Sequence, residues 1–493
     1  MAKAAVSVVS RVVPVPAPPA GGYAAVREKL SFLDAPWVAT PPLQQVYLYE
    51  LAGGGHEFPA LVRRLKESLA ATLALYLPLA GKLAYDAETG DVVVDCSDAG
   101  VDFFEAEAEA DGDVRRLAGD GDGGARDVPA FLSLVPEHDA RVLPAAVLRV
   151  QVTRLGVGEE VARAAGLAIG VSVHHAVADG LAIALFVSAW ASACRGCSPV
   201  LPRPLGPPEH GRNAVAHAHP RGQDLARAVL NKVAPNLPVA NEMEDYLSHR
   251  ARRACRAFTL GADHVRSLKR RINELASRSS ATAGGGDGEP RPKPVSTFVA
   301  VSALCWTAFV RANGLAAGAD AHLAFQVDLR ARLRPPVAAR YSGNCIRGCL
   351  ASADAGELVD GEAGLLHASR AVRAAVAEVE AAPVARMASW VERAMRLPPS
   401  RVACVAGGPV FRVYETNDFG FGRPGCVEPV SMAGSPLLRK NDADDYSVNG
   451  GEGTIVLYAG KGDGEVYVSV SLDPTRVDAF KAHIISDGVR PRI

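Results

Sequence analysis

An apolar stretch interrupted by a polar turn most constrains what this chain can fold into. Residues 143 to 153 and 165 to 175 are two Val-rich runs typical of adjacent buried strands, and residues 181 to 194 have the length and Ala/Leu content of a buried helix. The turn between them contains His174, His175, Asp179 and Gly180. Such polarity is costly at the centre of a membrane span. The sequence therefore predicts two strands, a turn and a helix within a globular core.

The length of the chain exceeds what one hydrophobic core usually organises. It has 493 residues, of which 48% are apolar, so two domains are the default expectation. A segment rich in Pro, His, Arg and Asn follows the helix and has no sustained apolar period, which is typical of a linker. We predict an N-terminal domain over residues 1–205, a crossover linker over 206–250 and a C-terminal domain over 251–493.

The overall charge and the cysteines restrict the kind of partner and compartment. A formal net charge of -1 provides no cationic field for nucleic acid or a membrane surface, so small molecules are the expected partners. Arg11 and the prolines that follow it make the N-terminus a poor signal peptide. The cysteines are few and scattered, and the pair Cys194 and Cys197 lacks a second pair at zinc spacing. We expect a cytoplasmic protein without a metal site.

Hydrophobic periodicity predicts further elements. Apolar residues at three- and four-residue spacing predict an amphipathic helix that starts at Phe58 and stops at Pro78. Residues 466–472 alternate as a strand does, and Asp473-Pro474 then has the pattern of a helix start. Residues 105–127 are rich in Glu, Asp, Gly and Ala, so we expect a solvated surface excursion with little apolar material to fix it.

The turn that carries the two histidines is the candidate centre of chemistry. A strand-to-helix turn can present a side chain in a cleft, and a neutral imidazole can take the proton of a hydroxyl that attacks a thioester. Gly180 would let the chain turn sharply after this motif. Taken alone, however, the spacing His-x-x-x-Asp is common. A histidine satisfied by local hydrogen bonds, with Asp179 as a helix cap, explains the spacing better unless other motifs support catalysis.

Two other patterns suggest different chemistry and do not fit it. Gly170-Val171-Ser172-Val173-His174 resembles a nucleophile elbow, but a histidine stands where the closing glycine belongs. Gly420 to Gly425 matches G-x-G-x-x-G, yet it lacks the strand-then-helix context and the downstream acidic residue of a dinucleotide site. Direct transfer to the acceptor therefore fits better than serine hydrolase chemistry, and we reject a dinucleotide site.

Motifs spread over nearly the whole chain resemble those of the plant BAHD acyltransferases. The family patterns His-x-x-x-Asp-Gly and Asp-Phe-Gly-Trp-Gly stand here as His175 to Gly180 and as Asp418-Phe419-Gly420-Phe421-Gly422. Lesser family features follow in order: Ser31-Phe32-Leu33-Asp34, Pro78 to Leu83, Ser296-Thr297-Phe298, Trp306 and Val327-Asp328-Leu329-Arg330. The resemblance implies an α/β fold of two similar-sized domains related to chloramphenicol acetyltransferase, each with a mixed sheet and flanking helices. The active-site channel would lie between them.

The same resemblance implies a role for each site residue. His175 would be the catalytic base, while Asp179 would hold the turn in an ion pair, for which Arg330 is our candidate partner. A bidentate pair would lock the turn, and breaking it would leave a buried charge. The segment Asp418 to Gly422 would lie away from the reacting atoms and shape the CoA channel. Phe421 replaces the family tryptophan, which keeps an aromatic plug but loses the indole donor.

A third motif bears on the substrates. Tyr341-Ser342-Gly343-Asn344-Cys345 resembles the Tyr-Phe-Gly-Asn-Cys signature of anthocyanin and flavonoid-glucoside acyltransferases, many of which use malonyl-CoA. A turn packed near the domain interface explains it about as well. The favoured function is malonyl transfer from CoA to a phenolic or flavonoid glucoside. The alternatives are a hydroxycinnamoyl-CoA transferase acting on an alcohol or amine, and a family member that binds ligands or partners without turnover. Acyl-CoA is then a substrate, no cofactor is implied, and we expect a monomer.

Overall fold

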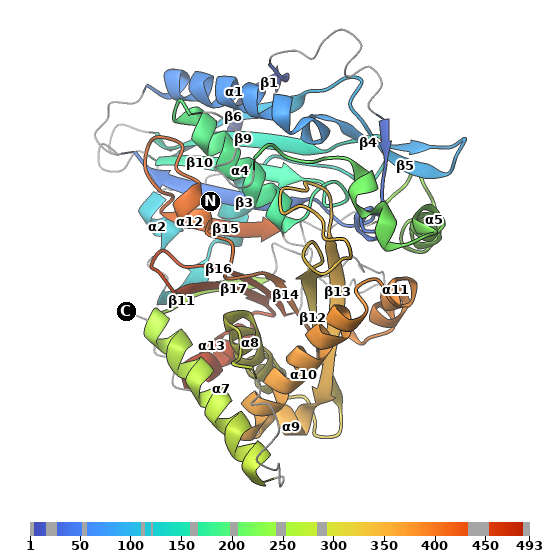
Figure 1. The fold of residues 1–493 in the computed structure, drawn as a ribbon. Coiled ribbons are helices and arrows are strands. Elements are labelled where there is room, and N and C mark those ends of the chain that lie inside the picture. Colours follow the sequence, from blue (N-terminus) through green and yellow to red (C-terminus); the bar gives the residue numbers. More distant parts are fainter. Residues whose placement is uncertain are drawn as a thin grey trace.

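The first of two large mixed sheets lies in the upper half of the computed structural model in Figure 1. The structure describes residues 4–15, 27–51, 57–109, 114–119, 122–157, 166–197, 206–242, 253–282, 293–431 and 453–486. In spatial order, the strands of this sheet are β1 (Ala5–Val12), β6 (Val101–Glu109), β9 (Leu148–Val157), β10 (Gly166–Val173), β3 (Leu43–Glu50) and β15 (Cys426–Ser431). Strands β9 and β10 pair antiparallel, with Val173 opposite Leu148, which confirms the predicted pair of adjacent strands.

Two helices that pack together accompany this sheet. Helix α1 (Phe58–Leu75) buries Leu61, Leu65 and Leu69, the face that the apolar spacing predicts. Helix α4 (Gly180–Cys194) follows the histidine turn and confirms the predicted buried helix. The side chain of Asp179 caps it, because one carboxylate oxygen accepts the N–H of Ala182 at 2.9 Å.

The second large sheet and its helices occupy the lower half of Figure 1. Its strands, in spatial order, are β13 (Ile346–Asp354), β12 (Asp320–Asp328), β14 (Val402–Gly407), β16 (Thr454–Ala459), β17 (Val466–Leu472), β11 (Ala254–Leu260) and β7 (Asp122–Arg126). Helix α8 (Thr297–Asn313) is almost wholly buried, and it packs against its neighbours α7 (Ala262–Thr282), α10 (Gly361–Ala381) and α13 (Val477–Ser486). The mixed sheets with flanking helices are those that the family resemblance implies.

The C-terminal prediction is correct for the strand and wrong for the start of the helix. Strand β17 has the predicted bounds. Helix α13 begins at Val477 rather than at Pro474, because the carboxylate of Asp473 accepts the N–H of Thr475 at 2.8 Å and closes a turn first.

Each large sheet takes one strand from the opposite part of the chain. Strand β15 pairs with β3 in the first sheet, and β7 pairs with β11 in the second. The excursion expected over residues 105–127 is exposed in part, at Arg115, Arg116 and Gly124, but it is fixed by regular structure, since it holds part of β6, then α2 (Val114–Ala118) and β7. Arg126 of β7 helps to fix this segment. Its side chain is buried beside Glu428 of β15, and Nε of Arg126 lies 3.3 Å from Oε2 of Glu428. The predicted domain limits stay a prediction.

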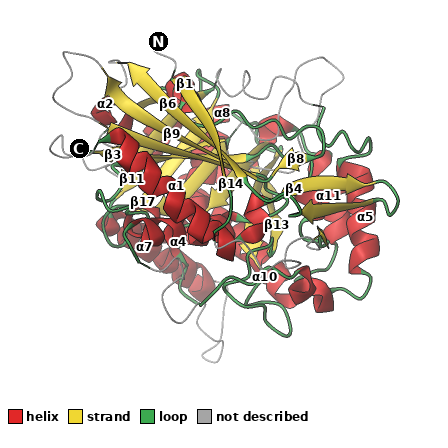
Figure 2. Cartoon of the chain, turned by 90° about the horizontal axis from the view of Figure 1, so that it is seen from above, coloured by secondary structure: helices red, strands yellow, loops and turns green. Residues whose placement is uncertain are grey.

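A smaller sheet lies at one end of the molecule, near the short helices α5 (Gly222–Val233) and α11 (Met387–Met395) (Figure 2). Its strands, in spatial order, are β2 (Arg27–Lys29), β5 (Asp91–Asp95), β4 (Lys82–Asp86) and β8 (Ala145–Ala146). Helix α5 belongs to the predicted linker, whose residues 243–250 lie outside the described residues. The remaining helices are η1 (Ala35–Trp37), η3 (Leu77–Ala80), α3 (Val128–Ser133), η4 (Arg212–Ala218), α9 (Ala355–Val359), η5 (Pro399–Arg401) and α12 (Val413–Thr416). No helix in the described ranges is long and apolar enough to cross a bilayer.

Candidate active site

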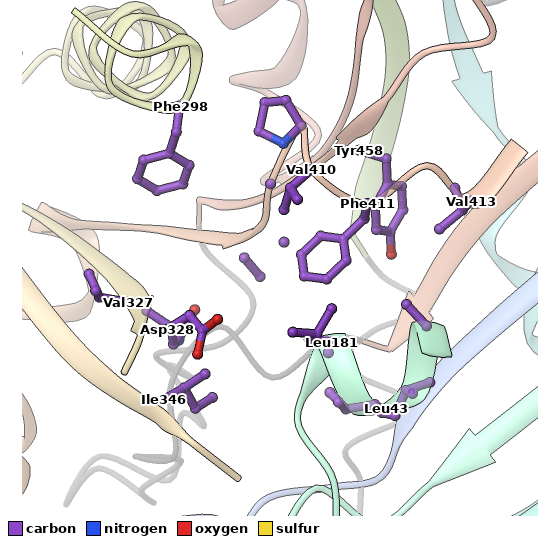
Figure 3. A pocket seen from close by; sticks show the side chains of 18 of the residues that line it. Leu43, Leu181, Phe298, Val327, Asp328, Ile346, Val410, Phe411, Val413 and Tyr458 are labelled. Carbon is purple, nitrogen blue, oxygen red and sulfur yellow. The ribbon is translucent and has the colours of Figure 1, made fainter. Parts of the chain in front are cut away.

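A cavity of about 680 Å³ is lined by residues of both large sheets. One wall comes from β3, β10 and the start of α4, and the other from β12, β14, β16 and the start of α8. Its lining is mostly apolar. Figure 3 shows side chains from separate elements around it: Leu181, Phe298, Ile346, Val410 and Phe411. A cavity of this size and character is typical of a small-molecule site.

His175 lines this cavity, whereas its neighbour His174 does not. His174 is fully buried, and its backbone N–H donates to the carbonyl of Val147 at 2.8 Å. Burial lowers the pKa of His174 to about 3. Burial also lowers the pKa of His175 to about 4, although its own carbonyl and Asp179 act in the opposite direction. Both imidazoles are therefore neutral at physiological pH, and the second of the pair meets the cavity.

Trp37, at the end of η1, lies on one face of the His175 ring. The two ring centroids are 4.0 Å apart and the planes differ by 10°. Trp37 is 2% exposed. Within the described part of the chain, no hydrogen-bond partner reaches the buried Nδ1 of His175. This contact could not be predicted from the sequence, because Trp37 has no motif of its own beyond its closeness to the Ser31–Asp34 segment.

Asp179 is buried behind the turn and does not line the cavity. The predicted contact with Arg330 is present: Nη2 lies 3.1 Å from Oδ1 and 2.9 Å from Oδ2. Its geometry differs from the bidentate pair that we predicted, because a single nitrogen faces both oxygens while Nη1 bonds Asp328 at 3.1 Å. The remaining hydrogen bonds to Asp179 come from the N–H groups of Ala182 and Cys345.

The segment Tyr341 to Cys345 braces the histidine turn from behind. Nη2 of Arg330 donates to the carbonyls of Tyr341 and Gly343, at 2.8 and 3.1 Å. The side-chain amide of Asn344 donates to the carbonyl of His175 at 2.8 Å. A Cβ on Gly343 would lie 2.4 Å from Oη of Tyr341, so only glycine fits there. None of the five residues lines the cavity, which matches the packed-turn explanation; an influence on the acceptor stays a prediction.

Asp34 connects this segment to the predicted linker. Its Oδ1 accepts from the backbone and side-chain N–H groups of Asn344, at 3.1 and 2.9 Å. Its Oδ2 accepts from the N–H of Ser31 at 2.9 Å and lies 3.3 Å from Nε of Arg212. Nη2 of Arg212 donates to the carbonyl of Val177, inside the histidine turn, at 2.7 Å. The role of Arg212 could not be predicted from the sequence, because no apolar pattern around it indicates burial.

Gly180 has a different role from the predicted sharp turn. It is the first residue of α4 and does not have a positive φ. It lines the cavity, where an added Cβ would lie 3.7 Å from Cζ of Phe411. Its missing side chain therefore leaves room beside Phe411 rather than permitting an unusual backbone.

The second family motif, Asp418 to Gly422, forms a self-bonded loop. Oδ1 of Asp418 accepts the N–H of Gly420 at 2.8 Å and that of Gly422 at 3.1 Å. Both glycines have positive φ, 95° and 101°, which side chains rarely tolerate. None of the five residues of the motif lines the cavity, so the predicted effect on a CoA channel stays a prediction.

This loop packs against the C-terminal end of α4. Phe419 is fully buried and meets Trp190 of α4 edge to face, 4.9 Å between centroids. Phe421 meets Tyr49 of β3 in the same way at 4.8 Å. Arg195, directly after α4, donates to the carbonyl of Asp418. The motif with Asp179 thus holds the beginning of α4, and this loop holds its end.

Comparisons with known proteins agree with this fold. The Transferase family matches residues 10–486. The chain is 29% identical to phenolic glucoside malonyltransferase 1 of Arabidopsis thaliana, over 82% of this chain and 84% of that protein. It is 26% identical to a hydroxycinnamoyltransferase of Narcissus pseudonarcissus, over 88% and 90%. The crystal structure of vinorine synthase has the same fold, with a TM-score of 0.68, 18% identity and 99% of both chains covered. The chain therefore belongs to the Transferase family, the BAHD acyltransferases.

Proposed function

We propose that the chain moves an acyl group from acyl-CoA to a hydroxyl of a small acceptor, with His175 as general base. The observation that carries the proposal is a neutral imidazole at the wall of an apolar cavity shared by both sheets. An unprotonated nitrogen beside that cavity can accept a proton from a bound hydroxyl at once. Asp179 does not line the cavity, so it supports the turn and does not take part as a catalytic carboxylate.

The proposed reaction needs one proton carrier. The acceptor oxygen attacks the thioester carbonyl while Nε2 of His175 takes its proton. The tetrahedral intermediate collapses, the C–S bond breaks, and the proton on His175 passes to the departing thiolate to give free CoA. The products are the ester and CoA, without a covalent acyl-enzyme. Neither a resident cofactor nor a metal takes part in this proposal.

We propose malonyl-CoA as donor and a phenolic or flavonoid glucoside as acceptor. Two observations support this choice. The Tyr341 to Cys345 segment resembles the signature of flavonoid-glucoside acyltransferases. The Arabidopsis relative named above is a phenolic glucoside malonyltransferase. The predicted monomeric state and cytoplasmic location stay predictions, which light scattering and cell fractionation can test.

The cavity lining favours a second candidate, an aromatic hydroxycinnamoyl donor on an alcohol or amine. A malonyl carboxylate loses water on binding and needs a cation near the acyl tip. Among the described residues, the Arg and Lys side chains that line the cavity are Arg330 and Arg332. Arg330 is bonded to Asp179 and to three other groups. Arg332 bonds the carbonyl of Asp328 at 2.8 Å and faces Glu380 at 3.4 Å. A neutral aromatic acyl group would need neither cation.

Release of free thiol from malonyl-, coumaroyl- and acetyl-CoA, each with one flavonoid glucoside, tests the proposal. We expect the highest kcat/KM with malonyl-CoA and product masses that show one added acyl group. A clear advantage for coumaroyl-CoA would select the second candidate. Ligand binding by calorimetry without thiol release from any donor would instead indicate a family member without turnover.

A further inference from the structure

We propose that Trp37 positions the imidazole of His175 for proton transfer by stacking on one face of the ring, a role that rests on the proposed function. The stack is close and nearly parallel, with centroids 4.0 Å apart and planes 10° apart. Trp37 does not line the cavity. It therefore acts through His175, as a positioning residue, and not through contact with either substrate.

Hydrogen bonds restrain the His175 ring only weakly, because its own carbonyl and the Asn344 side chain raise the pKa of the imidazole but neither forms a hydrogen bond of normal geometry with the buried Nδ1. A general base is often oriented by a carboxylate on its second nitrogen, but the buried Nδ1 of His175 has no such partner among the described residues. The carboxylate of Asp179, which acts on the ring more strongly than that of Asp34, is engaged by Arg330, Ala182 and Cys345. The hydrogen bond from the Asn344 amide ends on the carbonyl of His175, so it fixes the backbone of that residue directly. Packing against Trp37 must supply the remaining restraint.

Trp37 is itself held rigidly. Its backbone N–H donates to the carbonyl of Asp34 at 3.0 Å, within the single turn of η1. The carboxylate of Asp34 is bonded on both oxygens, to Asn344 on one side and to Ser31 and Arg212 on the other. The same network therefore fixes the backbone of His175 and the backbone of η1, which carries the buried indole that covers the ring. A rigid partner keeps an aromatic stack in one geometry.

The stack also excludes water from one face of the imidazole, which gives the proposal a pH signature. Among the described charged or titratable groups around His175, Asp179 and Asp34 favour its protonated form, each is paired with a cation, Arg330 and Arg212, and His174 is neutral. Burial outweighs the two carboxylates and lowers the pKa of His175 to about 4. Catalysis needs the neutral ring, so activity falls only when the pH drops through this low value. Removing the indole admits water and raises the pKa towards the ordinary value of about 6.5.

Three substitutions of Trp37 and one control test the inference. Trp37→Phe keeps an aromatic face, Trp37→Leu keeps apolar bulk without a ring, and Trp37→Ala removes both. Trp306→Leu, in α8, removes another fully buried indole as the control. For wild type, Trp37→Phe and the control, we expect kcat/KM to be nearly equal at pH 7.5 and 5.5. For Trp37→Ala we expect the ratio of kcat/KM at pH 7.5 to kcat/KM at pH 5.5 to rise, up to about tenfold if the pKa of His175 returns to its ordinary value.

The kinetic constants separate positioning from general damage to the fold. Trp37→Leu and Trp37→Ala should lower kcat by about tenfold to a hundredfold with little change in KM, since a misplaced base slows chemistry without weakening binding. Trp37→Phe should restore most of kcat. If Trp37→Ala does not fold, Trp37→Leu provides the same comparison. The proposal would be overturned if kcat/KM of a folded Trp37→Leu or Trp37→Ala protein fell at the same low pH as that of wild type. A Trp37→Phe protein as slow as Trp37→Ala would also overturn it.

A titration in the resting protein distinguishes this inference from the proposed function. The imidazole Cε1–H signal of His175 can be assigned in the NMR spectrum by its absence in His175→Ala. We expect it to titrate near pH 4 in wild type and closer to pH 6.5 in Trp37→Ala. This result would stand even if no donor released thiol, in which case the proposed function fails alone. Identical titrations in the two proteins would reject the stack as the cause of the low pKa.

Discussion

Among single residues, the two adjacent histidines have opposite surroundings. His174 is enclosed by the core and bonded to Val147, while His175 meets the cavity. We predict that His175→Ala lowers kcat by ~10²- to 10⁴-fold, the usual contribution of a general base, with a small change in melting temperature. His174→Ala should chiefly lower the melting temperature, because it leaves a cavity in the core. Steady-state rates and thermal melts of both variants check this, and equal rate losses in two folded proteins would contradict it.

The site could be predicted from the sequence only where a motif marks a residue. His175, Asp179 and Arg330 stand in recognisable patterns, and the structure brings all three to one turn. Trp37 and Arg212 stand in none. Their contacts join distant parts of the chain, as in the pair of Arg212 with Asp34, which is 178 positions away. Burial of an isolated Arg or Trp depends on tertiary packing, which local periodicity does not record.

Asn344 gives a second prediction at the residue scale. Its side-chain amide is the donor to the carbonyl of His175, so Asn344→Ala should loosen the turn and lower kcat at least tenfold, with a smaller effect on KM. Cys349→Ala, a comparably buried change in β13, should leave kcat near wild type. Steady-state kinetics of the two variants make the comparison. A normal kcat in Asn344→Ala would show that the Asp179 network alone fixes the turn.

At the scale of elements, α4 is a helix held at both ends by the two family motifs. Asp179 caps its first turn and pairs with Arg330, and the loop of Asp418 packs on its last turn. Breaking one side of a buried ion pair costs about 3 to 5 kcal/mol, because the other charge stays buried without a partner. We therefore predict strong coupling between Asp179→Ala and Arg330→Ala, so that the double variant loses less free energy of unfolding than the two single losses combined.

Denaturant unfolding of the four proteins in that cycle measures the coupling. A parallel cycle on Arg63 and Glu67 provides the control, because these side chains are 74% and 71% exposed and 3.9 Å apart on α1. Their coupling should be close to zero, since exposed ion pairs contribute little. Simple additivity for Asp179 and Arg330 would reject the view that their contact stabilises the beginning of α4.

In the molecule as a whole, the sequence did not predict a strand whose pairing depends on residues far along the chain. The strong local patterns of β9, β10, α4 and β17 were sufficient to locate these elements. The pattern of β7 was not, because Asp122 to Arg126 is polar and Gly-rich, and its partner β11 lies far along the chain. Strand β7 is fixed by the buried side chain of Arg126, which pairs with Glu428 in the other sheet. An ion pair of this kind leaves no periodic pattern in the local sequence.

The exchanged strands should make the two large sheets unfold together. Arg126 and Glu428 have side chains only 7% and 3% exposed. Glu428 also accepts hydrogen bonds from Tyr467 and Ser469 of β17, both at 2.9 Å. We predict one calorimetric transition for the wild type and one transition, at lower temperature, for Glu428→Ala, because the unpaired Arg126 destabilises both sheets.

Asp463→Ala is the control: its carboxylate is 93% exposed in a pair with Arg412, so the melting temperature should not change. Two separate transitions in Glu428→Ala would show that the sheets unfold independently and that the exchange of strands does not couple them.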